Sequence, residues 1–313
     1  MTVTVRLPEM RLPMLAAPMF LVSGPELVIA AGRAGIIGAF PSPNCRTTAD
    51  LDSWMGQISD SLGPEGRWAV NLVTHRSNSR LDDDLRLVDQ YRPPVVITAL
   101  GSPKPVMETV KGYGGLVIAD VVNVALAQKA VAAGVDGLAC ISAGAGGHTG
   151  HLSPFAFVSA VRQFFDGLII VGGGIADGHA LAGAITAGAD LAYVGTRFLA
   201  TQESLAAPEY KQMVVDLGID DIEVSATVTG TPASWLRPSL HAAGYGQTGN
   251  TAPQRDYDTN ADPAKRWKDI WAAGQGLNSI QNIRSVKETV TDMETEYLDA
   301  VQRMCARVST SQL

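Results

Sequence analysis

A chain of 313 residues with 46% hydrophobic residues and a net charge of −7 has the composition of a globular protein with a sizeable core. The acidic balance, without any cluster of Lys and Arg, argues against a nucleic-acid partner. No apolar run is long enough to span a bilayer, and the first residues lack a secretory signal pattern, so we expect a cytoplasmic protein without a membrane partner.

The cysteines and histidines give no sign of a disulfide framework or a metal centre. The three cysteines lie far apart and form no CxxC pair. Cys140 lies in an apolar run and is expected to be buried, whereas we expect Cys45, in a polar loop, to be an exposed bystander. No pair of histidines with a carboxylate has metal-ligand spacing, so the sequence predicts no metal site.

Short apolar runs alternate with Ala-rich helical stretches from residue 14 to about residue 200, a pattern typical of parallel βα units. The runs are continuous in Val, Ile, Leu and Ala, as expected for strands that helices cover. Two of the predicted helices, 124–133 and 178–187, end at glycines placed as C-caps, Gly134 and Gly188. The eight predicted strands are 15–18, 35–39, 68–71, 95–99, 116–119, 137–141, 168–171 and 191–194.

Eight strands with intervening helices predict a (β/α)8 TIM barrel of the α/β class. A doubly wound sheet is the alternative, but the first strand is followed by Ala17-Pro18-Met19 and not by a GxGxxG dinucleotide motif. After about residue 203 the periodicity weakens. We therefore expect a barrel over 1–202 and 286–313, and a small C-terminal cap over 203–285.

Two segments of the cap region and the final helix complete the prediction. Residues 244–262 are polar and are expected to form a loop over the barrel mouth that shapes substrate access. A helix is expected over 263–273, and a second one, over 286–307, returns to the barrel.

In a TIM barrel, functional residues lie on the loops after the carboxyl ends of the strands. Gly173 and Gly174 follow the seventh predicted strand, and Gly195 and Thr196 follow the eighth. Free backbone N–H groups at such turns, next to a helix N-terminus, suit a phosphate group. The simpler alternative for each glycine is a tight βα turn.

Two further strand ends carry residues suited to chemistry. Asn71 offers an amide that both donates and accepts hydrogen bonds, which suits a ring edge such as a flavin pyrimidine, although asparagine is also a common turn residue. His148 lies in the glycine-rich loop 143–150 after the sixth strand, where a titratable group would meet a bound ligand. A surface loop with an incidental histidine is the alternative reading.

Several motifs together make the chain resemble the nitronate monooxygenases, formerly called 2-nitropropane dioxygenases. The resemblance covers nearly the whole chain and implies an FMN-containing TIM barrel with a small second domain. Similar motifs occur in barrel-type FMN-dependent enoyl-ACP reductases and in some NADH:quinone reductases. The motifs are Ala17-Pro18-Met19, Ala145-Gly146-Gly147-His148-Thr149-Gly150, Gly172-Gly173-Gly174-Ile175-Ala176-Asp177-Gly178, Gly195-Thr196-Arg197-Phe198 and Trp271-Ala272-Ala273-Gly274-Gln275-Gly276.

The resemblance also implies roles for particular residues. His148 is the catalytic base or substrate-positioning group, and the glycines before it leave clearance for the flavin. The remaining cofactor-binding residues are Ala17, Pro18, Met19 and Asn71 at the isoalloxazine ring, Gly146 and Gly147 in the histidine loop, Gly173, Gly174, Gly195 and Thr196 at the phosphate, and Gln275 in the late segment.

The expected activity is the FMN-dependent oxidation of alkyl nitronates or nitroalkanes with O2 to a carbonyl compound and nitrite. The alternatives are an NAD(P)H-dependent FMN reductase, acting on quinones or an enoyl thioester, and a non-catalytic phosphate-binding barrel. Two positions depart from relatives: Gly144 stands where many of them have a glutamate, and Asp120 stands where some of them have a basic or hydroxyl residue near the flavin. The sequence leaves the oligomeric state open, a homo-oligomer included.

Overall fold

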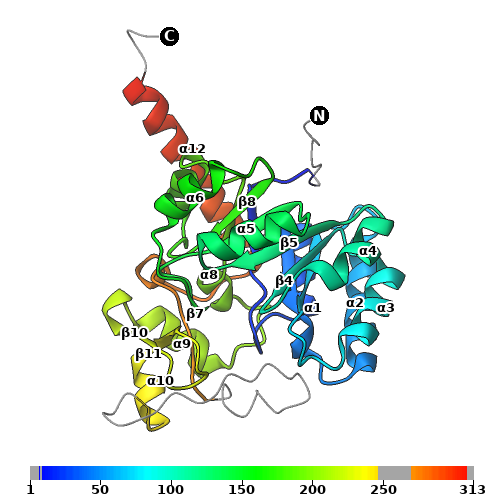
Figure 1. The fold of residues 1–313 in the computed structure, drawn as a ribbon. Coiled ribbons are helices and arrows are strands. Elements are labelled where there is room, and N and C mark those ends of the chain that lie inside the picture. The colour runs from blue at the N-terminus through cyan, green and yellow to red at the C-terminus, as the bar shows by residue number, and fades with distance from the viewer. Residues whose placement is uncertain (1–6, 8, 246–268, 309–313) are drawn as a thin grey trace.

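Eight parallel strands close into a barrel in the computed structural model, which describes residues 7, 9–245 and 269–308 (Figure 1). The predicted TIM barrel is therefore confirmed, with each predicted strand present. The barrel closes where β1 pairs with both β2 and β9. Its strands are β1 Met14–Ala16, β2 Ile37–Pro41, β3 Trp68–Val73, β4 Val95–Ala99, β5 Leu116–Val121, β6 Gly137–Ile141, β8 Leu168–Gly172 and β9 Leu191–Val194.

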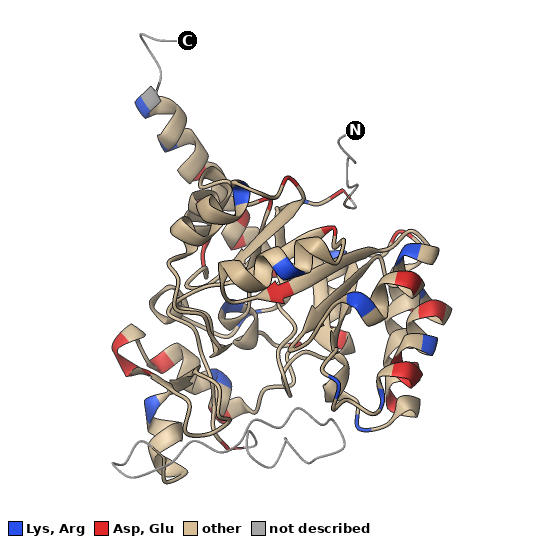
Figure 2. Cartoon of the chain, in the orientation of Figure 1, with Lys and Arg blue, Asp and Glu red and all other residues tan. Residues whose placement is uncertain are grey.

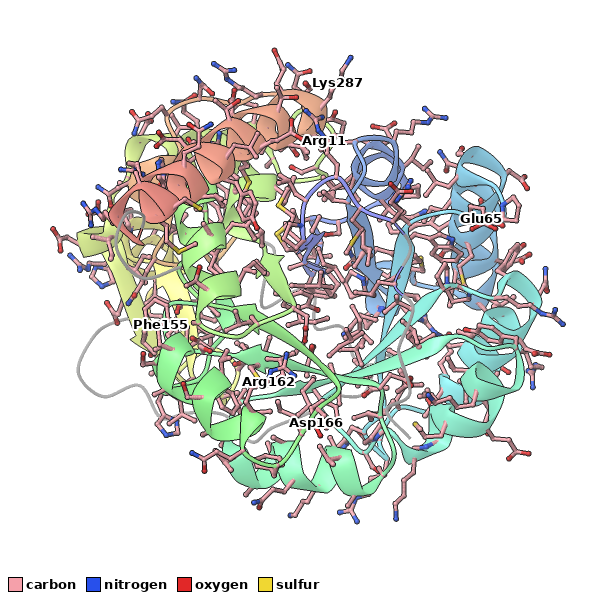
Figure 3. All side chains as sticks on the ribbon, turned by 90° about the horizontal axis from the view of Figure 1, so that it is seen from above. Arg11, Glu65, Phe155, Arg162, Asp166 and Lys287 are labelled. Carbon is pink, nitrogen blue, oxygen red and sulfur yellow. The ribbon has the colours of Figure 1, made fainter. Side chains whose placement is uncertain are left out.

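Helices surround the strands in the view along the barrel (Figure 3). Apolar side chains fill the barrel interior and also the layer between strands and helices. Ile97, Ile118 and Ile170 belong to the interior. The helices of this layer are α1 Pro25–Arg33, α2 Thr48–Leu62, α3 Leu81–Tyr91, α4 Lys104–Gly112, α5 Val124–Ala132, α6 Pro154–Arg162, α7 Gly178–Thr186, α8 Thr196–Leu199 and α12 Val286–Val308.

Local sequence signals set the helix ends. The Asn123 side chain accepts a hydrogen bond from the Leu126 N–H at 2.9 Å and so caps the start of α5. The helix ends at Ala132, and Gly134 follows in the left-handed region with φ +88°. This is the glycine that the sequence predicts as the stop signal.

The amino ends of the strands are fixed by Arg162, which Figure 3 labels. Its guanidinium donates to the carbonyl oxygens of Gly188 at 2.9 Å and Gly167 at 2.7 Å, and it forms an ion pair with Asp190. These contacts join the loops before β8 and β9, at the end of the barrel opposite the predicted site. They serve stability and leave the carboxyl ends to function.

A three-stranded sheet lies beside the barrel, in the order β10-β11-β7. β10 Ile222–Ser225 and β11 Ala233–Leu236 come from the region predicted as a cap, whereas β7 Gly147–His148 comes from the glycine-rich loop. The same region holds α9 Pro208–Asp216, α10 Arg237–Ala242 and two short 3-10 helices, η2 Ile219–Asp221 and η3 Leu277–Ser279. The glycine-rich loop is therefore tied into the cap by backbone pairing.

The helix predicted over 263–273 is wrong for the described part, 269–273, which is not helical. Its backbone groups bond to distant partners: the Trp271 N–H donates to Ser239 Oγ at 2.9 Å, and the Ala272 N–H donates to the Tyr210 hydroxyl at 3.0 Å. These bonds replace the i to i−4 bonds of a helix. Residues 263–268, and most of the loop predicted over 244–262, lie outside the described residues.

Acidic and basic residues are interspersed along the outer helices in the cartoon of Figure 2. The α12 helix packs against α7 and α1, with Val286, Val290 and Met293 buried beneath it. In the described residues, no helix has the length and apolar character needed to cross a membrane.

Candidate functional site

A cavity of about 2030 Å³ lies at the carboxyl ends of the barrel strands. Small-molecule sites more commonly measure roughly 300–1,000 Å³, so this cavity has room for a cofactor and a substrate together. Gln275 does not line it. All other predicted site residues do, namely Ala17, Pro18, Met19, Asn71, Gly146, Gly147, His148, Gly173, Gly174, Gly195 and Thr196.

The turn after β1 is held in place by side-chain hydrogen bonds. Asn44, in the 3-10 helix η1 Ser42–Asn44, accepts from the Leu21 N–H at 2.8 Å and donates to the Met19 carbonyl oxygen at 3.1 Å. The Met19 N–H donates to Ser23 Oγ at 3.0 Å. A Cβ on Gly195 would lie 3.7 Å from the Met19 sulfur, so the turns after the first and last barrel strands face each other.

The glycine loop, the turn after β8 and the late segment meet at Gly144. Its carbonyl oxygen accepts hydrogen bonds from the Gly174 N–H at 3.1 Å and the Gln275 N–H at 2.9 Å. Its φ of +87° lies in the left-handed region, and an added Cβ would lie 3.0 Å from Gln275 Oε1. This position therefore favours glycine, and a glutamate there would require a different backbone.

In the segment 271–276, Gly274 lines the cavity and Gln275 does not. The Gly274 N–H donates to Thr196 Oγ1 at 2.8 Å. A Cβ on Gly146 would lie 2.7 Å from the Gly274 nitrogen, so the two glycines allow close backbone approach. By contrast, an added Cβ on Gly174 meets nothing within 4 Å, which leaves an open space beside the turn after β8.

His148 is half-buried on the short strand β7 and lines the cavity. Its Nε2 lies 3.2 Å from Thr229 Oγ1, and the Thr229 hydroxyl donates its only proton to the Thr231 carbonyl oxygen at 3.1 Å. When the Thr229 hydroxyl donates to Thr231, its oxygen accepts from Nε2–H, and Nδ1 is then the basic nitrogen of the neutral ring. Pairing of His148 with Ala233 on β11 fixes the backbone beneath the ring.

Three side chains from different strands form a polar floor to the cavity: Asn71 on β3, Asp120 on β5 and Tyr193 on β9. Asn71 Nδ2 donates to Asp120 Oδ2 over 3.4 Å. Burial raises the pKa of Asp120 to about 7, and the Asn71 amide and the nearby Tyr193 hydroxyl offset part of that effect. Burial also raises the pKa of Tyr193 well above its ordinary value.

The sequence profile that describes nitronate monooxygenases matches residues 57–296, most of the chain. The chain belongs to the nitronate monooxygenase family. A nitronate monooxygenase from Paraburkholderia phytofirmans is 25% identical, with 74% of this chain and 75% of that protein covered. The predicted family is thereby confirmed.

Two further similar proteins carry the names of other enzymes. A (3aS,4S,5R,7aS)-5-hydroxy-7a-methyl-1-oxo-octahydro-1H-indene-4-carboxyl-CoA dehydrogenase from Rhodococcus jostii is 29% identical over 73% of this chain. The match spans only 63% of that dehydrogenase. The structure of a mutant of FabK from Thermotoga maritima superposes with a TM-score of 0.81 at 27% identity, covering 96% of both chains.

The donor set of this nitronate monooxygenase family member fits a phosphorylated flavin. The open space beside Gly174 and the small residues after β9 leave room for a phosphate, whereas the N-terminus of α7 is already capped by carboxylates and does not line the cavity. The polar floor offers both donors and acceptors to a ring edge. The individual cofactor contacts of the predicted residues stay predictions.

Cys45 contradicts the expectation of an exposed bystander, because it is 1% exposed. Its loop is packed beneath α3, where the Arg80 guanidinium donates to the Cys45 carbonyl oxygen at 2.6 Å. Burial raises the pKa of the Cys45 thiol to about 12, and does the same for Cys140. Neither thiol is poised for chemistry.

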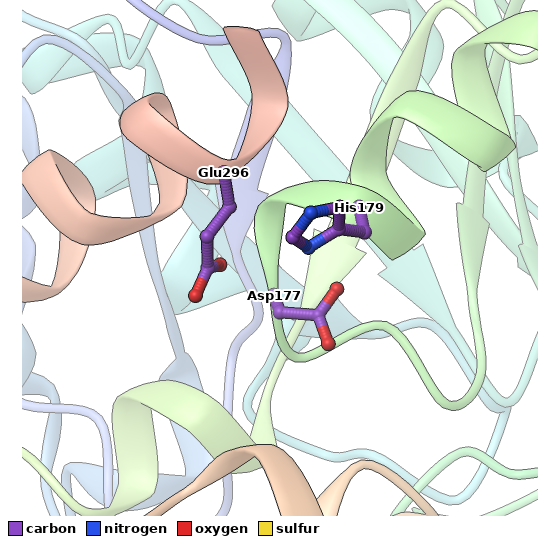
Figure 4. Close-up of side chains that lie close together, drawn as sticks. All are labelled: Asp177, His179 and Glu296. Carbon is purple, nitrogen blue, oxygen red and sulfur yellow. The ribbon is translucent and has the colours of Figure 1, made fainter. Parts of the chain in front are cut away.

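Asp177, His179 and Glu296 bring their ligand atoms within 4.8 Å of one another, away from the cavity (Figure 4). Their carboxylates already serve the helix ends: Asp177 accepts from the Ala180 N–H at 2.7 Å and Glu296 accepts from the Gly178 N–H at 2.7 Å. The cluster thus caps the start of α7 and docks α12 onto it. Glu296 is remote in sequence from Asp177 and His179, so residue spacing could not reveal the cluster.

Two residues of the site had no clear sequence signal. Tyr193 lies in the apolar run of β9, where a hydroxyl among aliphatic neighbours was the only available clue. Thr229, which fixes the tautomer of His148, comes from a Thr- and Ser-rich stretch without periodicity.

Proposed function

We propose that the protein is an FMN-dependent oxidoreductase that oxidises alkyl nitronates or nitroalkanes with O2 to a carbonyl compound and nitrite. The observation that carries this proposal is the placement of one histidine, His148, in the same cavity as the glycine turns suited to the cofactor phosphate. Family membership supports the same chemistry. Bound FMN would accept electrons from the substrate and pass them to O2.

The side chains of the chain supply positioning and proton transfer. In its neutral form, His148 would accept the α-proton of a nitroalkane at Nδ1, while Nε2–H stays bonded to Thr229. In its protonated form, the imidazolium would hold an anionic nitronate by charge. The apolar part of the lining, which includes Met19, Ile141 and Leu199, would limit the access of water to the reacting atoms.

The test is turnover of nitroethane and of ethyl nitronate by the FMN-loaded protein, followed through O2 consumption and nitrite release. The His148→Asn variant should keep its flavin and lose about 10²–10⁴-fold in turnover of the neutral nitroalkane. His151→Asn is the matched control, since His151 is exposed at the rim of the same cavity. Nitroethane oxidation at the parental rate in the His148 variant would remove the assigned role.

The second candidate is an NAD(P)H-dependent FMN reductase acting on a quinone or on a carrier-bound thioester. The cavity leaves room for a substrate of some length beside a cofactor. The similarity to a CoA-thioester dehydrogenase points in the same direction. Anaerobic mixing with NADH or NADPH separates the candidates: rapid bleaching of the flavin indicates a reductase, whereas bleaching by a nitronate alone indicates the oxidase.

A further inference from the structure

The polar floor of the cavity leaves two buried oxygen atoms without a hydrogen-bond partner among the described residues. These are Asp120 Oδ1 and the Tyr193 hydroxyl, both on the carboxyl-end side of the barrel; neither has a hydrogen bond within 3.5 Å in the described chain, although the hydroxyl lies near enough to Asp120 to lower the pKa of the carboxyl group. A buried polar atom without a partner costs about 1–3 kcal/mol, so such atoms in a native site call for a ligand that satisfies them. The second oxygen of Asp120 is already engaged by Asn71.

The surroundings of Asp120 favour a neutral carboxyl group. No lysine, arginine or histidine of the described chain is among the groups that shift its pKa; they are Asn71 and Tyr193 alone, beside burial. The backbone partner of Asp120 on β6 is Ala139, and the preceding residue, Ala119, pairs with Thr98 on β4. Neither pairing places a charged side chain opposite Asp120. The basic side chains that line the cavity elsewhere are His75, Lys104, Lys129, His148 and His151.

We propose that Asp120 binds the ring edge of the cofactor in its protonated form, so that FMN binding takes up a proton from solvent. This inference rests on the proposed function, since it requires FMN in the cavity. The protonated Oδ1 donates to a carbonyl oxygen of the ring. Asn71, whose amide nitrogen faces Asp120 Oδ2, presents its own oxygen as the acceptor for a ring N–H.

Three physical effects favour the protonated form of Asp120 when FMN binds. The ring covers the floor and removes the remaining water from Asp120, which disfavours the charged carboxylate. The FMN phosphate adds negative charge to the same cavity. A ring carbonyl accepts a hydrogen bond, so it stabilises only the protonated form of the carboxyl group. With a pKa of about 7 before binding, Asp120 is largely ionised at pH 8 and must gain a proton.

The experiment measures proton uptake by calorimetric titration of flavin-free, full-length protein with FMN at pH 8, in buffers of different ionisation enthalpy. We expect uptake of close to one proton per FMN, and a Kd that rises about tenfold per pH unit above pH 7. The phosphate, with a second pKa of about 6, is already a dianion at pH 8 and contributes little. Fluorescence quenching of FMN provides an independent Kd at each pH.

Two variants and one control distinguish proton uptake by Asp120 from a role in which its side chain only packs against the cofactor. Asp120→Asn should show no uptake and a flat Kd profile that matches the wild type near pH 6, because the amide donates as the neutral acid does. Tyr193→Phe should move the midpoint of the Kd profile to higher pH, because the Tyr193 hydroxyl lowers the pKa of Asp120. Glu209→Gln alters an exposed carboxylate at the cavity rim and should keep the wild-type uptake.

The outcomes distinguish this inference from the proposed function. Wild-type protein that binds no FMN at any pH would remove the proposed function and the inference with it. Protein that binds FMN with no proton uptake, or with proton release, would overturn the role of Asp120 alone. Equal loss of affinity at every pH in Asp120→Asn, with the slope retained, would show that the residue only packs.

Discussion

A buried ion pair supports the turn on which Met19 lies, and its removal gives the sharpest test of the packing described above. Arg80 Nε lies 2.8 Å from Asp84 Oδ1, with the two side chains 8% and 0% exposed. The Arg80 guanidinium also donates to the Ser42 carbonyl oxygen at 2.8 Å, and the Ser42 hydroxyl donates to Asp84 Oδ2 at 2.9 Å. This network holds η1, which carries Asn44 and through it the turn after β1.

Replacing Arg80 with methionine preserves volume and leaves the Asp84 carboxylate buried without a cation. Breaking one partner of a buried pair costs about 3–5 kcal/mol in the free energy of unfolding. A domain of this size loses roughly 2–4 °C in melting temperature per kcal/mol, so the melting temperature should fall by about 6–20 °C. Arg86→Met is the matched control on the same helix, because the Arg86 side chain is 74% exposed in its pair with Asp83 and should contribute little.

The destabilisation should depend on pH. Burial raises the pKa of Asp84, and Arg80 opposes that effect, so loss of Arg80 raises the folded-state pKa further. A group with a raised folded-state pKa stabilises the fold at low pH and loses that contribution as the pH rises through this pKa. Urea unfolding of Arg80→Met should therefore show a smaller deficit at pH 5 than at pH 8. A loss below about 1 kcal/mol, or an equal loss at both pH values, would refute the reasoning.

Other contacts in the structure give three more predictions. Thr229→Val should lower kcat/KM for nitroethane by about tenfold without loss of flavin, because His148 loses the bond that fixes its tautomer; an unchanged value would contradict that orientation. Gly144→Ala should destabilise the fold by about 1–3 kcal/mol in urea unfolding, since alanine is strained at φ +87°, and no loss would show that the loop adapts. In an Ellman titration of native protein, exposed Cys305 should react rapidly while the other two cysteines, Cys45 included, react only after unfolding.

The barrel and the face that carries the site could be predicted from the sequence because their signals are local. Continuous apolar runs mark strands covered on the outside by helices, and glycines such as Gly134 mark helix ends. Once the strands are placed, parallel topology brings their carboxyl ends together, so Asn71, His148 and Thr196 reach one cavity although they lie far apart in the chain.

The features that the sequence did not reveal depend on contacts between distant residues. Cys45 lies in a polar loop, and its burial follows from Arg80, which is 35 positions away. The non-helical course of 269–273 follows from hydrogen bonds to Tyr210 and Ser239, where the local pattern suggested a helix. Likewise, no spacing rule connects Asp120 with Tyr193, because they meet only when the barrel closes.

The pairing of β7 with β11 makes the position of His148 a matter of strand register. His148 lies opposite Ala233 and Gly147 lies opposite Ser234. In a β-ladder, a slip of one residue turns each side chain to the other face of the sheet. A one-residue slip of β11 against β7 would thus change which residue lies opposite His148, and a length change in the turn between β10 and β11 would move Thr229 relative to the imidazole, although the barrel strands stayed unchanged. Sequence changes in that hairpin are therefore a route by which relatives with this barrel could diverge in chemistry.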